Sequence, residues 1–265
     1  MDHVASADGT RIGWEVAGDG PPLVLLHGSV ADRARWAAVR DGLARRFTLH
    51  LADRRGRGLS RAEAAGPYAL AREGEDVAAV LGAVGPGALV LAHSYGGTCA
   101  LEAAATGAPM ARLLVYEPAF GTDAGPVFPD AALAGVEAAL ARGDLEAALE
   151  VFFADVLLLP APEIAAMRGT PAWRARVACA PTLAREARAA NAYRPDAARL
   201  TAVTAPARFL LGTETTPALT RSTRAAHAAL PGSELRELPG HGHAAMDADP
   251  EMFVAEVEDW LAVSP

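Results

Sequence analysis

Short, wholly apolar segments alternate with longer amphipathic segments through the first 116 residues. Apolar runs without polar alternation are typical of strands that are buried on both faces of a parallel sheet. Strands are therefore expected at 11–16, 23–26, 47–52, 88–92 and 113–116. The intervening segments have helical spacing, with helices expected at 31–45, 70–84 and 95–106. Regular alternation of strand and helix predicts a doubly wound α/β sheet with right-handed crossovers.

The pattern changes after Pro118. Residues 121–129 are rich in Gly and Pro, and the signals from 131 to about 199 are helical, with breaks at several prolines. Alternation then resumes, with strands expected at 207–211 and 234–238 and helices at 220–230 and 251–261. The chain is therefore expected to have an α/β core of residues 1–120 and 200–265, interrupted by a helical insertion of residues 121–199.

The amino-acid composition and net charge limit the kinds of molecule that the protein is expected to bind. The chain has 265 residues, of which 51% are hydrophobic, and a formal net charge of −8. Such acidity disfavours nucleic-acid binding, which depends on cations that neutralise phosphates, and no polybasic patch exists for an anionic membrane surface. All 24 basic residues are Arg, so mechanisms that need a lysine, such as a Schiff base, are excluded. The two cysteines, Cys99 and Cys179, are expected to be structural.

The chain shows no targeting or membrane signal. It begins Met-Asp-His-Val-Ala-Ser, without the basic start and apolar stretch of a signal peptide. No apolar run approaches the roughly 20 residues that span a bilayer. We expect a soluble, cytoplasmic protein that acts on a small molecule, with neither nucleic acid nor membrane as a partner.

The strongest local motif is Ala92-His93-Ser94-Tyr95-Gly96-Gly97, between an expected strand and an expected helix. A nucleophilic serine at this position sits on a sharp, strained turn that exposes its oxygen, and its flanking residues must be small because strand and helix lie close together. The usual first Gly of the motif is Ala92 here. The alternative is an ordinary helix start with Ser94 as N-cap. We favour Ser94 as the catalytic nucleophile.

A second motif, His27-Gly28-Ser29, follows an apolar strand. Gly28 permits a sharp turn, after which the Ser29 amide can point at a substrate oxyanion together with the amide of Tyr95. Such donors stabilise a tetrahedral intermediate. His27 is interpreted as a structural histidine that bonds the loop, in preference to a catalytic one.

The general base is sought in Pro239-Gly240-His241-Gly242-His243, between the last strand and the last helix. A base must lie on a loop that can fold over the nucleophile, and His243 has the better position of the two histidines. His241 is interpreted as a loop residue. A metal site from this pair is the alternative, but no Cys or carboxylate cluster completes it.

The order of these motifs resembles the α/β-hydrolase family over essentially the whole chain. The order comprises a strand with His-Gly, the stretch from Asp53 to Ser60, the Ser94 turn, a helical insert and a late Gly-His. The resemblance implies an eight-stranded, mostly parallel sheet, a small helical cap at about 121–199 and a Ser-acid-His triad that needs no cofactor and no metal. It also implies that the stretch from Asp53 to Ser60 is a structural loop near the site, whose arginines are solvated or brace the loop.

The acid is where this sequence departs from the family. Members usually carry an Asp three residues after the Gly that ends the seventh strand, and Thr215 occupies that position here. Glu214 stands one residue earlier, whereas Glu117 follows the sixth strand directly, where some branches place a glutamate. Either carboxylate can orient an imidazole. We favour Glu117, keep Glu214 as the alternative, and regard Asp247 as a weaker candidate.

The expected activity is hydrolysis of a carboxylic ester or thioester of a small, apolar substrate through an acyl-enzyme. Dehalogenases and epoxide hydrolases of this fold use an Asp nucleophile, and related hydroxynitrile lyases use a Lys, so all three classes are disfavoured here. The same triad can also serve perhydrolysis, lactone opening, acyl transfer or a tailoring lyase or cyclase step. A non-catalytic ligand binder on this fold is the third possibility. The sequence leaves the oligomeric state open.

Overall fold

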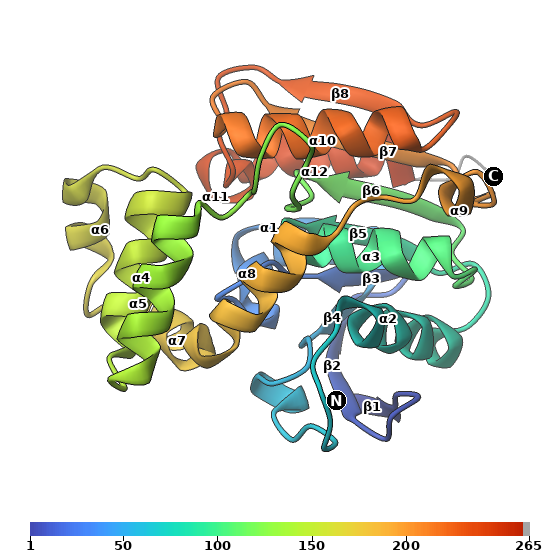
Figure 1. Ribbon diagram of the computed structural model, residues 1–265. Helices are drawn as coiled ribbons and strands as arrows, with labels where there is room; N and C mark the ends of the chain where they lie inside the picture. Colours follow the sequence, from blue (N-terminus) through green and yellow to red (C-terminus); the bar gives the residue numbers. More distant parts are fainter. Residues whose placement is uncertain (262–265) are drawn as a thin grey trace.

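A computed structural model describes residues 1–261 as an eight-stranded sheet in the order β1-β2-β4-β3-β5-β6-β7-β8 (Figure 1). The strands are β1 (Asp2–Ala5), β2 (Arg11–Ala17), β3 (Pro22–Leu26), β4 (Thr48–Ala52), β5 (Leu89–His93), β6 (Arg112–Tyr116), β7 (Ala207–Gly212) and β8 (Glu234–Leu238). The β1–β2 and β2–β4 pairs are antiparallel, and every later pair is parallel. The predicted fold class, a mostly parallel α/β-hydrolase sheet of eight strands, is confirmed.

Helices cover both faces of the sheet (Figure 1). One face carries α2 (Leu70–Val84), α3 (Tyr95–Ala105) and α10 (Pro217–Ala229), and the opposite face carries α1 (Ala37–Ala44) and α12 (Pro250–Leu261). The parallel strands are therefore sandwiched between two helical layers. This arrangement explains why the sequences of the central strands β3, β5, β6 and β7 lack polar alternation. The edge strand β8 mixes polar and apolar residues and is mostly exposed.

Alternate residues of one strand enter different hydrophobic clusters. Val24 and Leu26 of β3 pack in the cluster that includes α2 and α3, whereas Leu23 and Leu25 pack with Trp36 and the α12 side chains. All four side chains are buried. Successive side chains of a strand point to opposite faces, so a wholly apolar run supplies both cores at once.

A run of helices without strands lies between β6 and β7 in the described chain, and in Figure 1 most of it forms a lobe beside the sheet. Its elements are α4 (Asp130–Ala141), α5 (Leu145–Val151), the π-helical turn η3 (Phe152–Val156), α6 (Ala161–Met167), α7 (Pro171–Cys179), the 3₁₀ turn η4 (Ala180–Thr182), α8 (Leu183–Ala192) and α9 (Ala197–Leu200). The division at residues 121 and 199 into core and cap stays a prediction. No helix among residues 1–261 is long and apolar enough to cross a membrane.

The remaining short elements differ from those predicted from the sequence. The expected helix at 31–45 begins as a 3₁₀ turn, η1 (Arg33–Trp36), because Asp32 caps it by accepting from the Ala34 amide. Strand β1 was not predicted, since its four residues are mostly exposed and carry no apolar run. Two other short elements are η2 (Gly58–Ser60) and α11 (Ala245–Ala248).

Four buried charges join the loop after β4 to the helical insertion. Arg54 forms two hydrogen bonds with Glu73 of α2, at 3.1 and 2.6 Å, and lies 3.1 Å from Glu186 of α8. Arg57 donates to Glu186 as well, and all four side chains are at most 2% exposed. The arginines of this loop therefore brace the structure. Of the two roles expected for them, solvated or bracing the loop, Arg54 and Arg57 have the second, because buried carboxylates from α2 and α8 pair with them.

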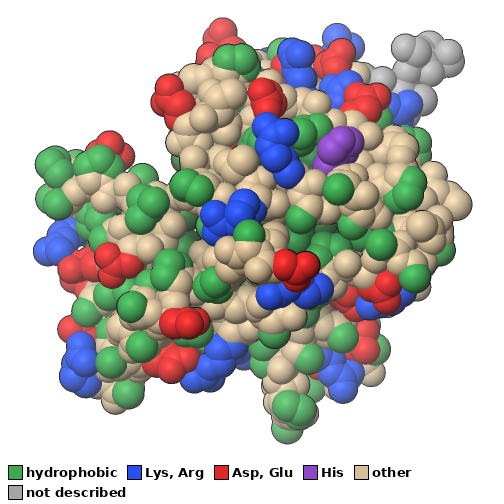
Figure 2. All heavy atoms as spheres, turned by 45° about the horizontal axis from the view of Figure 1, so that its top comes forward, with side chains coloured by type: hydrophobic (Ala, Val, Ile, Leu, Met, Phe, Trp, Pro, Cys, Tyr) green, Lys and Arg blue, Asp and Glu red, His purple; other side chains and the backbone are tan. Residues whose placement is uncertain are grey.

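The charged side chains on the surface form ion pairs that are open to water, unlike the buried network. Figure 2 shows acidic and basic side chains interspersed over one face of the molecule, with apolar side chains between them. The pair Arg188–Glu137, at 2.7 Å, is an example in which Arg188 is 64% and Glu137 35% exposed. Pairs of this kind contribute little to stability, because water screens them.

We expect Glu186→Gln to lower the free energy of unfolding by about 3 kcal/mol, because removing one member of a buried ion network leaves guanidinium charge uncompensated. Urea denaturation at pH 7 measures this loss. The matched control is Glu137→Gln, whose partner stays solvated, and it should change stability by less than about 0.5 kcal/mol. Equal effects of the two variants would contradict a structural role for the buried network.

The lowered pKa of the Glu186 carboxylate predicts that the stability of the protein depends on pH. Burial alone would raise the pKa of Glu186, but Arg54 and Arg57 outweigh burial and lower the pKa from 4.5 to about 2. A carboxylate whose pKa is lower in the folded state stabilises the protein above its unfolded pKa, and this contribution is lost as the pH falls below about 4.5. Unfolding measured from pH 6 to pH 3 should therefore depend less steeply on pH in Glu186→Gln than in the unaltered protein.

Candidate active site

Ser94 occupies a strained turn between β5 and α3. Its φ of 56° and ψ of −129° lie outside the regions that non-glycine residues prefer. A Cβ on Gly96 would lie 2.4 Å from the carbonyl oxygen of His27, and one on Gly97 would lie 2.6 Å from Cγ1 of Val115. The two glycines are therefore required for α3 to start this close to β3 and β6. This is the geometry of a nucleophile elbow.

The loop after β3 lies against this turn. A Cβ on Gly28 would lie only 2.7 Å from Cβ of Ser94, so the loop can approach the serine only with glycine at that position. The amide of Ser29 takes part in none of the backbone hydrogen bonds of loops and turns in the described chain. Tyr95 is the first residue of α3, so its amide has no acceptor within the helix. Both amides thus remain available to an oxyanion beside Ser94.

His27 holds this loop from behind. Its Nδ1–H donates to the carbonyl of Gly28 at 2.8 Å, and its Nε2 accepts from the Arg54 amide at 3.1 Å. Burial, with the nearby Arg57 and Arg54, lowers the pKa of His27 well below its ordinary value. The ring is neutral and both of its nitrogens are occupied, which is the structural role proposed from the sequence.

His243 and Glu117 lie together although 126 positions separate them in the chain. The Nδ1–H of His243 donates to Oε2 of Glu117 at 2.5 Å, and the glutamate side chain is fully buried. Oε1 of Glu117 accepts from the Gly212 amide and Oε2 from the Thr215 hydroxyl, each at 2.8 Å. Thr215, at the usual position of the family's acid, therefore supports the glutamate that contacts the imidazole.

The side chains of the other candidates from the sequence form no hydrogen bond with His243 in the described part of the chain, although Glu214 and Asp247 line the same cavity. Glu214 is exposed, and no hydrogen bond joins its carboxylate to His243 among residues 1–261. Asp247 pairs with Arg35 at 2.7 Å. His241 contributes its backbone carbonyl, which accepts from the Glu214 amide at 2.9 Å. No group of three or more His, Cys, Asp or Glu side chains within the described range could hold a metal ion.

Two residues that the sequence reasoning did not single out fix the His243 loop. His93 Nε2–H donates to the carbonyl of His243 at 2.9 Å, and the two rings lie 4.4 Å apart. Burial, together with His243, lowers the pKa of His93 well below its ordinary value. The Tyr116 hydroxyl donates to the carbonyl of Gly242. The only signal in the sequence was their position at the carboxyl ends of β5 and β6, where sites form in such sheets.

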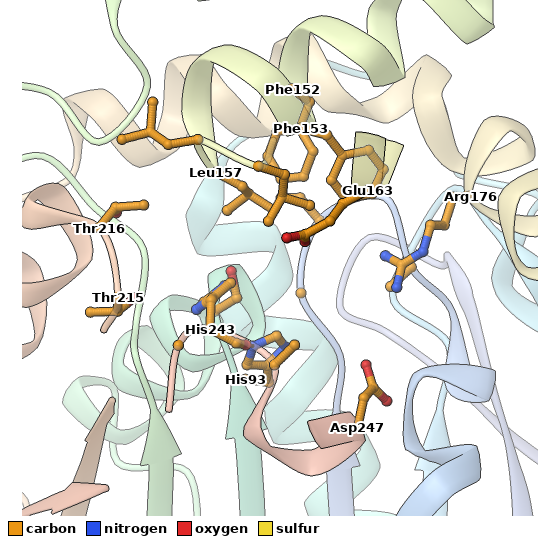
Figure 3. Close-up of a pocket in the computed structure, with 18 of the residues that line it drawn as sticks. His93, Phe152, Phe153, Leu157, Glu163, Arg176, Thr215, Thr216, His243 and Asp247 are labelled. Atoms are coloured by element: carbon orange, nitrogen blue, oxygen red, sulfur yellow. Dashed lines mark hydrogen bonds between the residues drawn. The ribbon is translucent and has the colours of Figure 1, made fainter. Parts of the chain in front are cut away.

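Ser94 and His243 face one cavity of about 460 Å³ between the sheet and the helical insertion. Figure 3 shows Phe152, Phe153 and Leu157 on the side opposite His243. No hydrogen bond joins Ser94 Oγ to His243 among the residues the structure describes. Hydrogen bonds of this kind are often long before substrate binds. The cavity has the size of a small-molecule site, with one apolar wall.

The chain belongs to the alpha/beta hydrolase family, whose pattern it matches over residues 23–256. An alpha/beta hydrolase from Sphaerobacter thermophilus is 32% identical, with a TM-score of 0.81 and coverage of 96% of this chain and 99% of that one. The esterase RhEst1 from Rhodococcus sp. is 28% identical, with a TM-score of 0.77 and coverage of 98% of both chains.

Several curated relatives match this chain over only about a third of its length. A pimeloyl-[acyl-carrier protein] methyl ester esterase from Nitrosospira multiformis is 39% identical over 94 residues, which is 34% of this chain and 35% of the relative. The chain therefore spans about a third of the length of this relative. An uncharacterized protein from Mycobacterium bovis is 27% identical over 96% of this chain and 79% of its own length.

The close approach of Gly28 to Ser94 predicts that a larger residue at position 28 lowers esterase activity. Gly28→Ala places a methyl group where Ser94 already lies, so the loop must move and its amide leaves the oxyanion position. We expect kcat/KM for an activated ester to fall at least about 100-fold, the usual cost of losing one oxyanion donor. The control is Gly82→Ala in α2, where no atom lies within 4 Å of the added Cβ, and its activity should be unchanged. Full activity in Gly28→Ala would show that this approach is not required.

Proposed function

We propose that the protein is a serine hydrolase that cleaves a carboxylic ester or thioester of a small substrate. The observation that carries this proposal is the hydrogen bond from His243 to the buried Glu117, beside the strained Ser94. A base that is held by a carboxylate, next to a serine on an elbow, is the arrangement that activates a hydroxyl for acyl transfer. The esterase names of RhEst1 and of the curated relative agree with the same activity.

In the proposed reaction His243 removes the Ser94 proton as Oγ attacks the ester carbonyl. The tetrahedral intermediate collapses when His243 returns that proton to the leaving alcohol or thiol, and an acyl-enzyme remains. Water then attacks the acyl carbon, gives one proton to His243 and releases the carboxylic acid as Ser94 regains its proton. Each turnover consumes one ester and one water and yields one acid and one alcohol or thiol.

Glu117 serves to orient the imidazole and to stabilise its cationic form. It presents Oε2 to Nδ1, so Nε2 of His243 is left free for the Ser94 hydroxyl. The amides of Ser29 and Tyr95 supply the oxyanion donors. Two preorganised donors in a site shielded from water lower the barrier by several kcal/mol.

A fluorophosphonate probe tests the nucleophile and the acid together. We expect Ser94 to be labelled, with no labelling in Ser94→Ala and a steep loss in His243→Ala. The rate constant for labelling of Glu117→Gln should fall about 10³- to 10⁴-fold, because glutamine neither stabilises the imidazolium nor enforces the correct tautomer.

Glu214→Gln is the matched control, since it removes one exposed carboxylate that lines the same cavity without a hydrogen bond to His243. It should label at the rate of the unaltered protein. A steep loss in Glu214→Gln with none in Glu117→Gln would assign the acid to the loop after β7. Absence of any label on the folded, unaltered protein would contradict the serine-hydrolase proposal, and a ligand binder would then be the better account.

A further inference from the structure

One wall of the cavity carries a cation that the proposed mechanism does not use. Arg176, on α7 of the helical insertion, lines the same cavity as Ser94 and His243. In Figure 3 its guanidinium points into the cavity, above Asp247 and across from His243. The guanidinium carbon lies 5.5 Å from the centre of the Phe153 ring, which itself stacks on Trp173. Packing therefore holds this charge at the cavity wall.

Arg176 forms no hydrogen bond and no salt bridge with any residue that the structure describes, whereas the neighbouring Arg35 does. Arg35 pairs with Asp247 at 2.7 Å and its side chain is only 7% exposed. Burial and the repulsion of Arg35 lower the pKa of Arg176 to about 10, so the side chain is still a cation at neutral pH. Asp247 and Asp32 act in the opposite direction, but they only partly offset burial and Arg35. The five N–H donors of this half-buried guanidinium have no acceptor among residues 1–261, so they are available to an anion.

Three carboxylates also line this cavity, but none forms a salt bridge with Arg176 in the part of the chain that the structure describes, and Asp247 offsets its charge only in part. Glu163 and Glu214 are exposed residues, and Asp247 is 46% exposed and already paired with Arg35. Water screens exposed carboxylates, and none of the three lies within 4 Å of the Arg176 guanidinium. The more enclosed charge on this wall is therefore positive, beside the apolar surface of Phe152 and Leu157.

We propose that the cavity takes esters that carry a second, anionic group, a carboxylate or a comparable oxyanion, which Arg176 binds while Ser94 attacks the ester carbonyl. The planar guanidinium matches the two oxygens of such a group. The apolar wall suits the hydrocarbon between the two ends. This assignment rests on the proposed hydrolase function and adds the chemical class of its substrate.

Matched ester pairs test the proposal at pH 7. The first pair is monomethyl adipate and the methyl ester of adipic acid monoamide, with the variable group on the acyl side. The second pair is the butanoyl ester of glycolate and that of glycolamide, with the variable group on the alcohol side. Carboxylate and carboxamide have nearly the same shape, so the ratio of kcat/KM within each pair isolates the charge. The pair with the larger ratio shows on which side the anion lies.

We expect the unaltered protein to prefer the carboxylate at least about tenfold in one pair, the effect of one charge-assisted hydrogen-bonded contact. Arg176→Gln should bring that ratio close to one, mainly through KM, and Arg176→Lys should keep part of it. Arg142→Gln is the control, because Arg142 is exposed at the end of α4 and lies outside the cavity. It removes the same net charge and should keep the full ratio.

Two results would overturn the proposal: a ratio of one or less in both pairs, or a ratio that Arg176→Gln leaves unchanged. Failure of the hydrolase function looks different, since no ester would be cleaved and Ser94 would not react with the fluorophosphonate. Calorimetric titration with adipate and with adipamide decides the anion site even then. Tighter binding of adipate that is lost in Arg176→Gln supports the site, and equal binding of the two compounds refutes it.

Discussion

The hydrogen bond between His243 and Glu117 joins the loop after β8 to the end of β6, and the geometry of the site depends on it. Glu117 can serve there because β6 and β7 are in parallel register, with Tyr116 beside Leu210 and the Glu117 amide donating to the Leu210 carbonyl at 3.2 Å. The glutamate has a φ of 47°, an uncommon conformation for a non-glycine residue, and its side chain reaches Nδ1 of the imidazole. Its remaining acceptor capacity is met by Gly212 and Thr215, so a fully buried carboxylate has partners for both oxygens.

Thr215 shows why the identity of the acid was hard to predict. In the sequence, a threonine at the usual aspartate position indicates only that the common arrangement is missing. In the structure its hydroxyl reaches Glu117 at 2.8 Å, so the two loops still converge on one carboxylate. The sequence could place Glu117 at a strand end, but the hydrogen bond depends on the register of β6 and β7, which no local pattern encodes.

The parts of the fold that could be predicted are those with a local signal. Apolar runs predicted the central strands β3, β5, β6 and β7 closely, because each of them is short and buried on both faces. The roles of the arginines could not be predicted in this way. Arg57 donates a hydrogen bond to Glu186, which lies 129 positions away in the chain. In the sequence Arg176 is one polar residue of a weakly amphipathic helix, and only the fold places it at the cavity of Ser94. Pairings over such distances come from tertiary structure alone.

Glu117 holds the Nδ1 proton of His243 in this structure, and proton NMR tests that hydrogen bond directly. A strong hydrogen bond between an imidazole and a buried carboxylate shifts the shared proton far downfield and protects it from exchange with water. We predict one such resonance in the spectra of the unaltered protein and of Glu214→Gln. We predict that it is absent from the spectra of Glu117→Gln and His243→Ala. A resonance that persists in Glu117→Gln, or one that disappears in Glu214→Gln, would contradict the assignment of Glu117 as the acid.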